Sequence, residues 1–223
     1  MIGLAYAMTG EIQSILDSTG ARLLETVCGV SVYEIEPDLV AYTGGIGKVN
    51  AAMSAQLFID RFHPEWIVNA GVAGSFMDLP IGTIVLAKDF VQHDVDTTPM
   101  GDPIGLVSTV NRIDFPTSEA EKLSQILTNQ GVAHQLGRVA TGEVFMTKGE
   151  RADWVAETFS PMLCEMEGGA IAQVCFRNEV KFTALKSVSD RLCQENNAEE
   201  FFNYGEAMAK LNSIVLPFAK ALR

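Results

Sequence analysis

Short strand-like segments alternate with segments of helical periodicity along most of this chain. Apolar or alternating runs bounded by glycine, proline or polar residues predict strands. The predicted strands are Ile2–Ala7, Arg22–Val27, Val30–Glu36, Leu39–Thr43, Trp66–Ala70, Ile84–Val91, Leu163–Met166 and Phe182–Val188, with a further segment near Arg138. The Cys28-Gly29 turn predicts an antiparallel hairpin between the second and third of them.

Helical periodicity fills most of the intervals between these strands. One helix is predicted from about Gly10 to Ser18, with Gly20 as its stop. A longer one follows Gly44-Gly45 and ends at His63-Pro64, because proline disfavours helix in the residue before it. The pattern predicts that its buried face consists of Val49, Ala52, Met53 and Leu57.

Two capping boxes predict further helix starts. Ser118 with Glu121 indicates a helix running to Gly131, and Thr147 with Glu150 indicates one running to about Phe159. Another helix carries Ile171, Val174 and Cys175 on one face. A C-terminal helix with an expected kink at Pro217 has apolar residues at helical spacing: Met208, Leu211, Val215, Phe218 and Leu222.

This alternation predicts an α/β fold with a mixed, mostly parallel sheet flanked by helices on both faces. With 223 residues, no internal repeat and no linker, we expect one domain over residues 1–223. The stretch His93–Pro116 is rich in Asp, Thr, Pro and Gly and reads as a long loop. Loops of this length in compact domains are usually functional or part of an interface.

Charge and cysteine usage narrow the possible functions. The net charge of −12 opposes attraction to nucleic acid or to anionic membranes. The start of the chain lacks the pattern of a signal peptide, and no apolar run approaches membrane-spanning length. No CxxC pair or zinc-site spacing connects Cys28, Cys164, Cys175 and Cys193. We therefore expect a cytoplasmic protein that binds no metal, with free thiols.

Unusual polar side chains follow several of the predicted strands. Glu11, Glu167 and Asp190, with the ring of Phe145, would meet at one edge of the sheet if these strands were parallel. Carboxylates crowded in a cleft raise one another's pKa, which suits acid and base catalysis near neutral pH. Equally, Glu11 and Glu167 could stabilise helix N-termini, Asp190 could cap a turn, and Phe145 could belong to the core.

Glycines 44, 45 and 47 with Lys48 suggest a phosphate-binding turn only superficially. The segment lacks both the GxxxxGK[ST] and the GxGxxG spacing. Phosphate binding is therefore not predicted there.

At these residues the chain resembles the nucleoside phosphorylase/nucleosidase superfamily, and most closely the bacterial 5′-methylthioadenosine/S-adenosylhomocysteine nucleosidases. The resemblance rests on motifs that follow one another in the family's order through most of the chain. These motifs are Ala7–Glu11, Gly44–Val49, Asn69–Gly74, His93–Asp96, Thr141–Phe145, Cys164–Ala172 and Ser187–Asp190. The resemblance implies a nucleoside phosphorylase-like α/β domain, usually assembled as a homodimer, with the 93–116 loop and Met100 near the interface.

The resemblance also implies roles for individual residues. Glu11 matches the acidic residue that activates the attacking water, and Asp190 matches the general acid that protonates N7 of the departing adenine. The remaining matches are to substrate-binding positions. Met166 and Glu167 match the ribose contacts, Phe145 and the Met146 backbone match the purine contacts, Gly74 matches a backbone contact, and Met8, Ile46 and Phe201 match the apolar 5′-alkylthio pocket.

The expected reaction is hydrolysis of the N-glycosidic bond of 5′-methylthioadenosine and S-adenosylhomocysteine, without metal or organic cofactor. Protonation of the leaving base and a carboxylate near the cationic sugar both favour this cleavage. A carboxylate at Glu11 and the absence of arginine in its turn favour water over phosphate as nucleophile. The chain departs from many relatives at Val72, Ser75 and Lys186, where they have Ser, Gly and Arg. A phosphorylase, a futalosine-type hydrolase and a non-catalytic nucleoside sensor remain alternatives.

Overall fold

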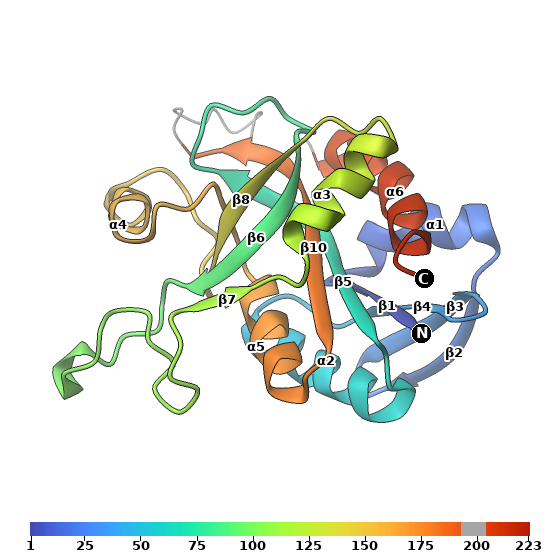
Figure 1. Cartoon of the computed structure of the whole chain (residues 1–223), viewed down its shortest axis with the longest axis horizontal. Helices are drawn as coiled ribbons and strands as arrows, with labels where there is room; N and C mark the ends of the chain where they lie inside the picture. The colour runs from blue at the N-terminus through green and yellow to red at the C-terminus, as the bar shows by residue number, and fades with distance from the viewer. Residues whose placement is uncertain (193–203) are drawn as a thin grey trace.

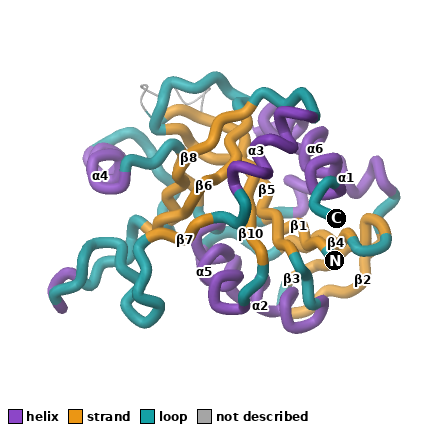
Figure 2. The backbone as a smooth tube through the Cα atoms, viewed as in Figure 1, coloured by secondary structure: helices purple, strands orange, loops and turns teal. Residues whose placement is uncertain are grey.

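A computed structural model describes residues 1–192 and 204–223 of the chain. Helices cover a twisted sheet on two sides, and an arm formed by part of the 93–116 segment projects from it (Figures 1 and 2). The strands of the described residues are β1 Ile2–Tyr6, β2 Arg22–Val27, β3 Val30–Glu36, β4 Leu39–Thr43, β5 Trp66–Ser75, β6 Ile84–Gln92, β7 Asp114–Pro116, β8 His134–Thr141, β9 Leu163–Glu165 and β10 Lys181–Arg191. The helices there are α1 Thr9–Thr19, α2 Lys48–Phe62, α3 Ala120–Asn129, α4 Glu150–Phe159, α5 Gly168–Asn178 and α6 Tyr204–Lys220.

The sheet closes on itself in one half and stays open in the other. β5 pairs with β10, β10 with β6, β6 with β8, β8 with β9, and β9 with β5, so these five strands form a ring. From β5 the open half continues through β1, β4, β3 and β2. The mixed sheet is confirmed, and its described pairings divide equally, with five parallel and five antiparallel.

The strand side chains alternate between two apolar clusters, one on each face of the sheet. In β5, Ile67 belongs to the cluster under α2 and α5, whereas Trp66 and Val68 belong to the cluster under α1, α3 and α6. This alternation follows from the two-residue period of a strand. A third, smaller cluster joins α4 to the ends of β6 and β8.

The sequence predicted most element positions but not the buried face of α2. The predicted strands appear, and β5, β6 and β10 extend one or more residues beyond their predicted ends. Gly20 ends α1 as expected, with the left-handed φ of 65° that glycine adopts without strain. On α2 the prediction is half right: Ala52 and Leu57 pack against the core, but Val49 is 78% exposed and Met53 41% exposed. The helix instead buries Ala51, Ser54, Ala55, Phe58 and Ile59.

Both predicted capping boxes are wrong, although both helices exist. α3 starts after Glu119 and α4 after Gly149, and neither has a side-chain cap. The Ser118 hydroxyl instead accepts a hydrogen bond from the Phe182 amide at 3.1 Å, which connects this turn to β10. A long-range partner therefore displaces the local one that the pattern suggested.

The 93–116 segment contains more structure than a plain loop. It includes the short helix Thr98–Met100 and the strand β7, which pairs with β6. Thr97 and Ser108 both donate to the Asp102 carboxylate, so the arm between these elements is held by its own hydrogen bonds. Met100 lies at its tip region and is 83% exposed.

Candidate active site

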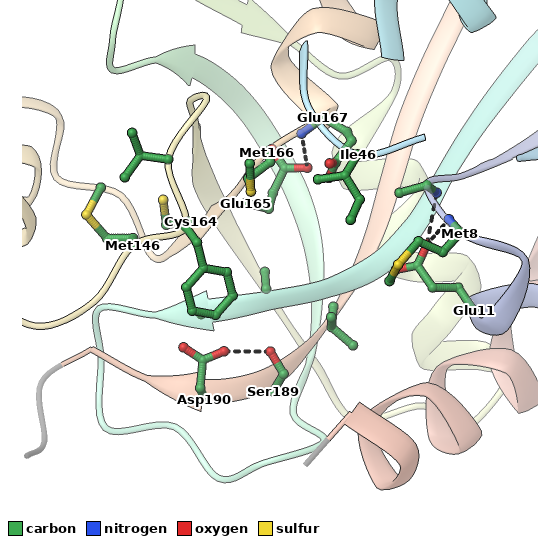
Figure 3. A pocket seen from close by; sticks show the side chains of 16 residues that line it. Met8, Glu11, Ile46, Met146, Cys164, Glu165, Met166, Glu167, Ser189 and Asp190 are labelled. Atoms are coloured by element: carbon green, nitrogen blue, oxygen red, sulfur yellow. Dashed lines mark hydrogen bonds between the residues drawn. The ribbon is translucent and has the colours of Figure 1, made fainter. Parts of the chain in front are cut away.

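One cavity collects the predicted site residues at the ends of β1, β5, β8, β9 and β10. It has about 700 Å³ of atom-free space, including the part that opens to solvent. Figure 3 shows Glu11 and Asp190 on different sides of it, with Glu167, Met166 and Ile46 along its upper wall. The predicted residues that line it are Met8, Glu11, Ile46, Gly74, Phe145, Met146, Met166, Glu167 and Asp190. Phe201, the remaining predicted contact, lies outside the described residues.

Glu11 lies in the first turn of α1 and turns back over the end of β1. Its Oε2 accepts hydrogen bonds from the Ala7 and Met8 amides at 2.9 and 3.0 Å. The side chain is buried, and burial raises the pKa of Glu11 above its ordinary 4.5. The Met8 amide and the nearby Lys186 ammonium oppose that rise by favouring the ionised form. The raised pKa makes this carboxylate a better proton acceptor than an exposed glutamate.

Asp190 lies at the end of β10, where a β-bulge re-aims the strand. The register with β5 shifts between Val188 and Asp190, which places Asp190 beside Gly74. A Cβ atom on Gly74 would lie 2.8 Å from Asp190 Oδ2, so only glycine leaves room for the carboxylate. Ser189 donates to Asp190 Oδ1 at 2.7 Å. Burial raises the pKa of Asp190, which favours the protonated form that a general acid needs.

Glu167 lies at the start of α5 and faces the turn before α2. The Gly47 amide donates to its Oε1 at 2.8 Å. Burial, followed by the charge of neighbouring Glu165, raises the pKa of Glu167 to about 7. This carboxyl therefore changes protonation state near neutral pH.

Glu165 and Lys186 form a buried ion pair that the sequence did not single out as part of the site. Their charged atoms are 2.9 Å apart, and the side chains are only 3% and 2% exposed. Glu165 lines the cavity and also accepts hydrogen bonds from the Thr141 hydroxyl and from the Gly168 amide. The sequence does contain a signal for this ion pair. Lys186 lies inside the apolar predicted strand Phe182–Val188, and a buried ammonium requires an acidic partner.

Apolar groups complete the walls between these carboxyls. Met8, Val72 and Met166 line the interior, while Ile46 and Phe145 are about half exposed and lie at the mouth. Such a lining suits a flat base and an apolar substituent more than a phosphate group.

The strand ends meet only partly in the way that was expected. β5 and β10 are parallel, but β9 runs antiparallel to β5 and pairs with its last two residues, Gly74 and Ser75. β8 is parallel to β9 and so also opposes β5. The site residues therefore converge where β5 crosses the short β9 at the ring closure. The parallel edge that was expected from the sequence exists for Glu11 and Asp190, because β1 and β10 both run parallel to β5. It does not extend to Phe145 and Glu167, which follow the opposing strands β8 and β9.

Chemically, several carboxyls dominate the lining of the cavity. Its described lining contains four acidic residues (Glu11, Glu165, Glu167 and Asp190) and no Lys, Arg or His. No group of three His, Cys, Asp or Glu in the described part of the chain is arranged to hold a metal ion. Cys28, Cys164 and Cys175 are free thiols, as expected.

Comparison with known proteins agrees with this geometry. The sequence profile described as the phosphorylase superfamily matches residues 2–220. The chain belongs to the phosphorylase superfamily. Within it, the chain is 38% identical over 179 residues to a 5′-methylthioadenosine/S-adenosylhomocysteine nucleosidase of Geobacillus thermodenitrificans, covering 78% of this chain and 75% of the relative. It is 33% identical to a protein of the same name from a Geobacillus species, across 100% of this chain and 99% of the relative.

Solved structures of the phosphorylase superfamily share the whole fold. The Helicobacter pylori 5′-methylthioadenosine/S-adenosylhomocysteine nucleosidase with butyl-thio-DADMe-Immucillin-A superposes with a TM-score of 0.91 and 26% identity, covering 99% of this chain and 97% of that one. The native futalosine hydrolase of Helicobacter pylori gives a TM-score of 0.89, also at 26% identity and with 99% and 97% coverage. The resemblance stated from the motifs and the nucleoside phosphorylase-like α/β fold are confirmed. No helix in the described residues has the length and apolar character to span a membrane.

Proposed function

We propose that residues 1–223 form one nucleosidase domain that hydrolyses the N-glycosidic bond of 5′-methylthioadenosine and S-adenosylhomocysteine. The products are adenine and the corresponding 5-thioribose. Relatives that carry this activity in their names, at 33 to 38% identity, support the substrate class. The cavity's carboxyls and apolar walls support the chemistry.

The observation that favours hydrolysis over phosphorolysis is the place of the Glu11 carboxylate. It occupies the two backbone amides, Ala7 N–H and Met8 N–H, that a bound anion would otherwise use. The Glu11 charge opposes an anion at this position, and the described lining contributes no Lys, Arg or His to hold a phosphate. Water carries no charge and needs a base, which Glu11 provides.

In the proposed reaction, Glu11 and Asp190 act on opposite ends of the scissile bond. The bond from C1′ of the sugar to N9 of adenine breaks, and its electron pair leaves with the base. Asp190 gives its proton to N7 of the adenine, so the leaving group departs neutral. Water forms the new C1′–O bond and gives a proton to Glu11. The raised pKa of Asp190 and the buried position of Glu11 support these roles.

The remaining residues bind the nucleoside between these two groups. Glu167 accepts hydrogen bonds from the sugar hydroxyls beside Met166, and its charge stabilises the cationic sugar of the transition state. Phe145 stacks on the purine, and the Met146 backbone contacts its edge. Met8 and Ile46 surround the 5′ substituent, to which Phe201 is the further predicted contact. Gly74 keeps space for Asp190 next to the substrate.

A futalosine-type hydrolase is the second candidate. The structural similarity to the Helicobacter pylori futalosine hydrolase favours it, at nearly the same TM-score as to the nucleosidase. The chemistry at the glycosidic bond would be the same, and only the 5′ substituent would differ.

A substrate panel separates these possibilities. Purified protein is incubated with methylthioadenosine, adenosylhomocysteine, adenosine, inosine and aminodeoxyfutalosine, and the free base is quantified. We expect adenine release from the first two substrates at the highest kcat/KM. Preference for aminodeoxyfutalosine would select the second candidate, and tight binding without base release would indicate a sensor.

The proposal includes a homodimer. Exposed apolar side chains support it: Val49 and Met53 on the outer face of α2, and Met100 on the arm. Sedimentation velocity of the wild-type protein should give twice the mass of one chain. The double variant Val49→Glu with Met53→Glu should contain a larger monomer fraction than the wild type. Cytoplasmic location and the absence of a cofactor stay predictions.

A further inference from the structure

Asp94 connects two separate segments that carry the mouth of the cavity. It follows β6, and its Oδ1 lies 2.6 Å from the Lys48 ammonium at the start of α2. Its other oxygen, Oδ2, accepts a hydrogen bond from the Glu143 amide at 2.9 Å. Lys48 follows the 44–47 turn, which carries Ile46, and Glu143 belongs to the 142–149 loop, which carries Phe145.

A further contact closes this set of bonds into a circuit. Glu143 Oε1 accepts a hydrogen bond from the Val49 amide at 3.2 Å, in the first turn of α2. The loop and the turn are therefore connected both through Asp94 and directly. Gly47 has a φ of 93°, which favours glycine, and a Cβ atom there would lie 2.5 Å from Glu143 Oε2.

The surroundings make the Asp94 contacts stronger than surface ion pairs. The Lys48 and Asp94 side chains are 18% and 15% exposed. Lys48 also donates to Gln92 on β6 at 3.2 Å, and Gln92 in turn donates to Gln173 on α5 at 2.7 Å. Burial raises the pKa of Asp94, but Lys48 and the Glu143 amide outweigh it and hold the pKa below its ordinary 3.8. Asp94 thus stays ionised and paired.

We propose that Asp94 is a positioning residue that holds the Ile46 turn and the Phe145 loop at the separation that the nucleoside requires. This inference rests on the proposed function, in which Phe145 stacks on the purine and Ile46 contacts the 5′ substituent. Asp94 does not line the cavity, so it acts through these two segments. Contacts to the base and to the 5′ group are present in ground and transition states alike. Loss of Asp94 therefore weakens binding more than it slows the chemical step.

The test is the kinetics of Asp94→Ala and Asp94→Asn with methylthioadenosine. For Asp94→Ala we expect KM to rise at least about fivefold, in keeping with the loss of charge-assisted hydrogen bonds, while kcat changes less than about twofold. Asparagine keeps one acceptor oxygen and loses the other, so Asp94→Asn should give an intermediate KM. Lys48→Met combined with Asp94→Ala should raise KM by less than the product of the single effects.

Glu25→Ala provides the matched control. Glu25 pairs with Arg61, with Oε1 2.6 Å from Nε, at the other end of the same helix α2. Its loss should leave both KM and kcat at wild-type values. If the role of Asp94 were only structural, its loss would reduce the folded fraction and so lower apparent kcat at unchanged KM.

Either an unchanged KM in Asp94→Ala or an equal rise of KM in Glu25→Ala overturns the inference. A wild-type protein that releases no adenine would instead contradict the proposed function, so the two failures are distinguishable.

Discussion

Single carboxyls with different surroundings explain how one cavity can contain both a base and an acid. Glu11 accepts hydrogen bonds from two backbone amides, whereas Asp190 accepts one from the Ser189 hydroxyl. Burial raises the pKa of both, and Lys186 opposes the rise only for Glu11. The sequence predicted these two residues through their motifs. It did not predict that a buried Lys186–Glu165 pair lies behind them, because that pairing joins β9 to β10.

Asp190→Asn should abolish adenine release while leaving nucleoside binding largely intact. General acid catalysis contributes about 10² to 10⁴ in rate, and asparagine has no proton to donate at this position. Single-turnover assays measure the rate, and calorimetric titration with methylthioadenosine measures affinity. Asp78→Asn, at an exposed carboxylate that pairs with Arg191, serves as the control. Wild-type turnover by Asp190→Asn would refute its role.

Lys186→Met should be strongly destabilising, and Lys186→Arg should not. Removing the ammonium leaves Glu165 as an unpaired buried charge, a change that costs about 3–5 kcal/mol in comparable cases. It also removes a charge that lowers the pKa of Glu11. The acid limb of the pH profile of kcat/KM should therefore move to higher pH. Urea unfolding and the pH profile measure the two effects, and wild-type values for Lys186→Met would contradict this account.

At the scale of helices and strands, the sequence specified where elements lie better than which face they bury. The turn residues Gly20 and Cys28-Gly29 act locally, so the elements that they separate were predictable. The burial of α2 depends on packing against α5, and apolar Val49 and Met53 misled the prediction because they lie on its outer face. Ser118 likewise accepts a hydrogen bond from Phe182 in β10 instead of capping its own helix α3.

Asn212 on α6 should be required for the packing of α1, which carries Glu11. Its Nδ2 donates to the Glu11 carbonyl at 2.7 Å and to the Ser14 hydroxyl at 2.8 Å, in a buried position. Asn212→Leu should lower the free energy of unfolding by about 1–3 kcal/mol, the cost of unpaired buried polar groups. Ser213→Ala, at the adjacent exposed residue, should change it little. Equal stability of the two variants in urea would show that this contact is unimportant.

For the whole molecule, the closed ring of strands determines the site. It brings residues 66–75 and 181–191 together as neighbours, the teal and orange strands β5 and β10 of Figure 1. It also pairs the end of β5 with β9. Such pairings are not encoded in local periodicity, so the sequence predicted the parallel edge that carries Glu11 and Asp190 but not the opposing direction of β8 and β9. Several carboxyls then share one buried region, so the stability of the fold depends on pH.

Glu167→Gln should stabilise the protein at alkaline pH but not at acid pH. The pKa of Glu167 is raised from 4.5 to about 7, so between these values the folded state binds a proton that the unfolded state has lost. Stability therefore falls as pH rises through that window and stays lower above it. Glutamine remains neutral and can still accept from the Gly47 amide. The Tm difference between variant and wild type should be near zero at pH 4 and positive at pH 8; equal differences at both would contradict the assignment.

The most direct test of the central claim is the dependence of adenine release on phosphate. Wild-type protein is incubated with methylthioadenosine in phosphate-free buffer and in buffer with added phosphate, and the sugar product is identified by mass spectrometry. We expect equal rates in both buffers and methylthioribose as the sugar product. Release that requires phosphate and yields methylthioribose 1-phosphate would contradict water activation by Glu11.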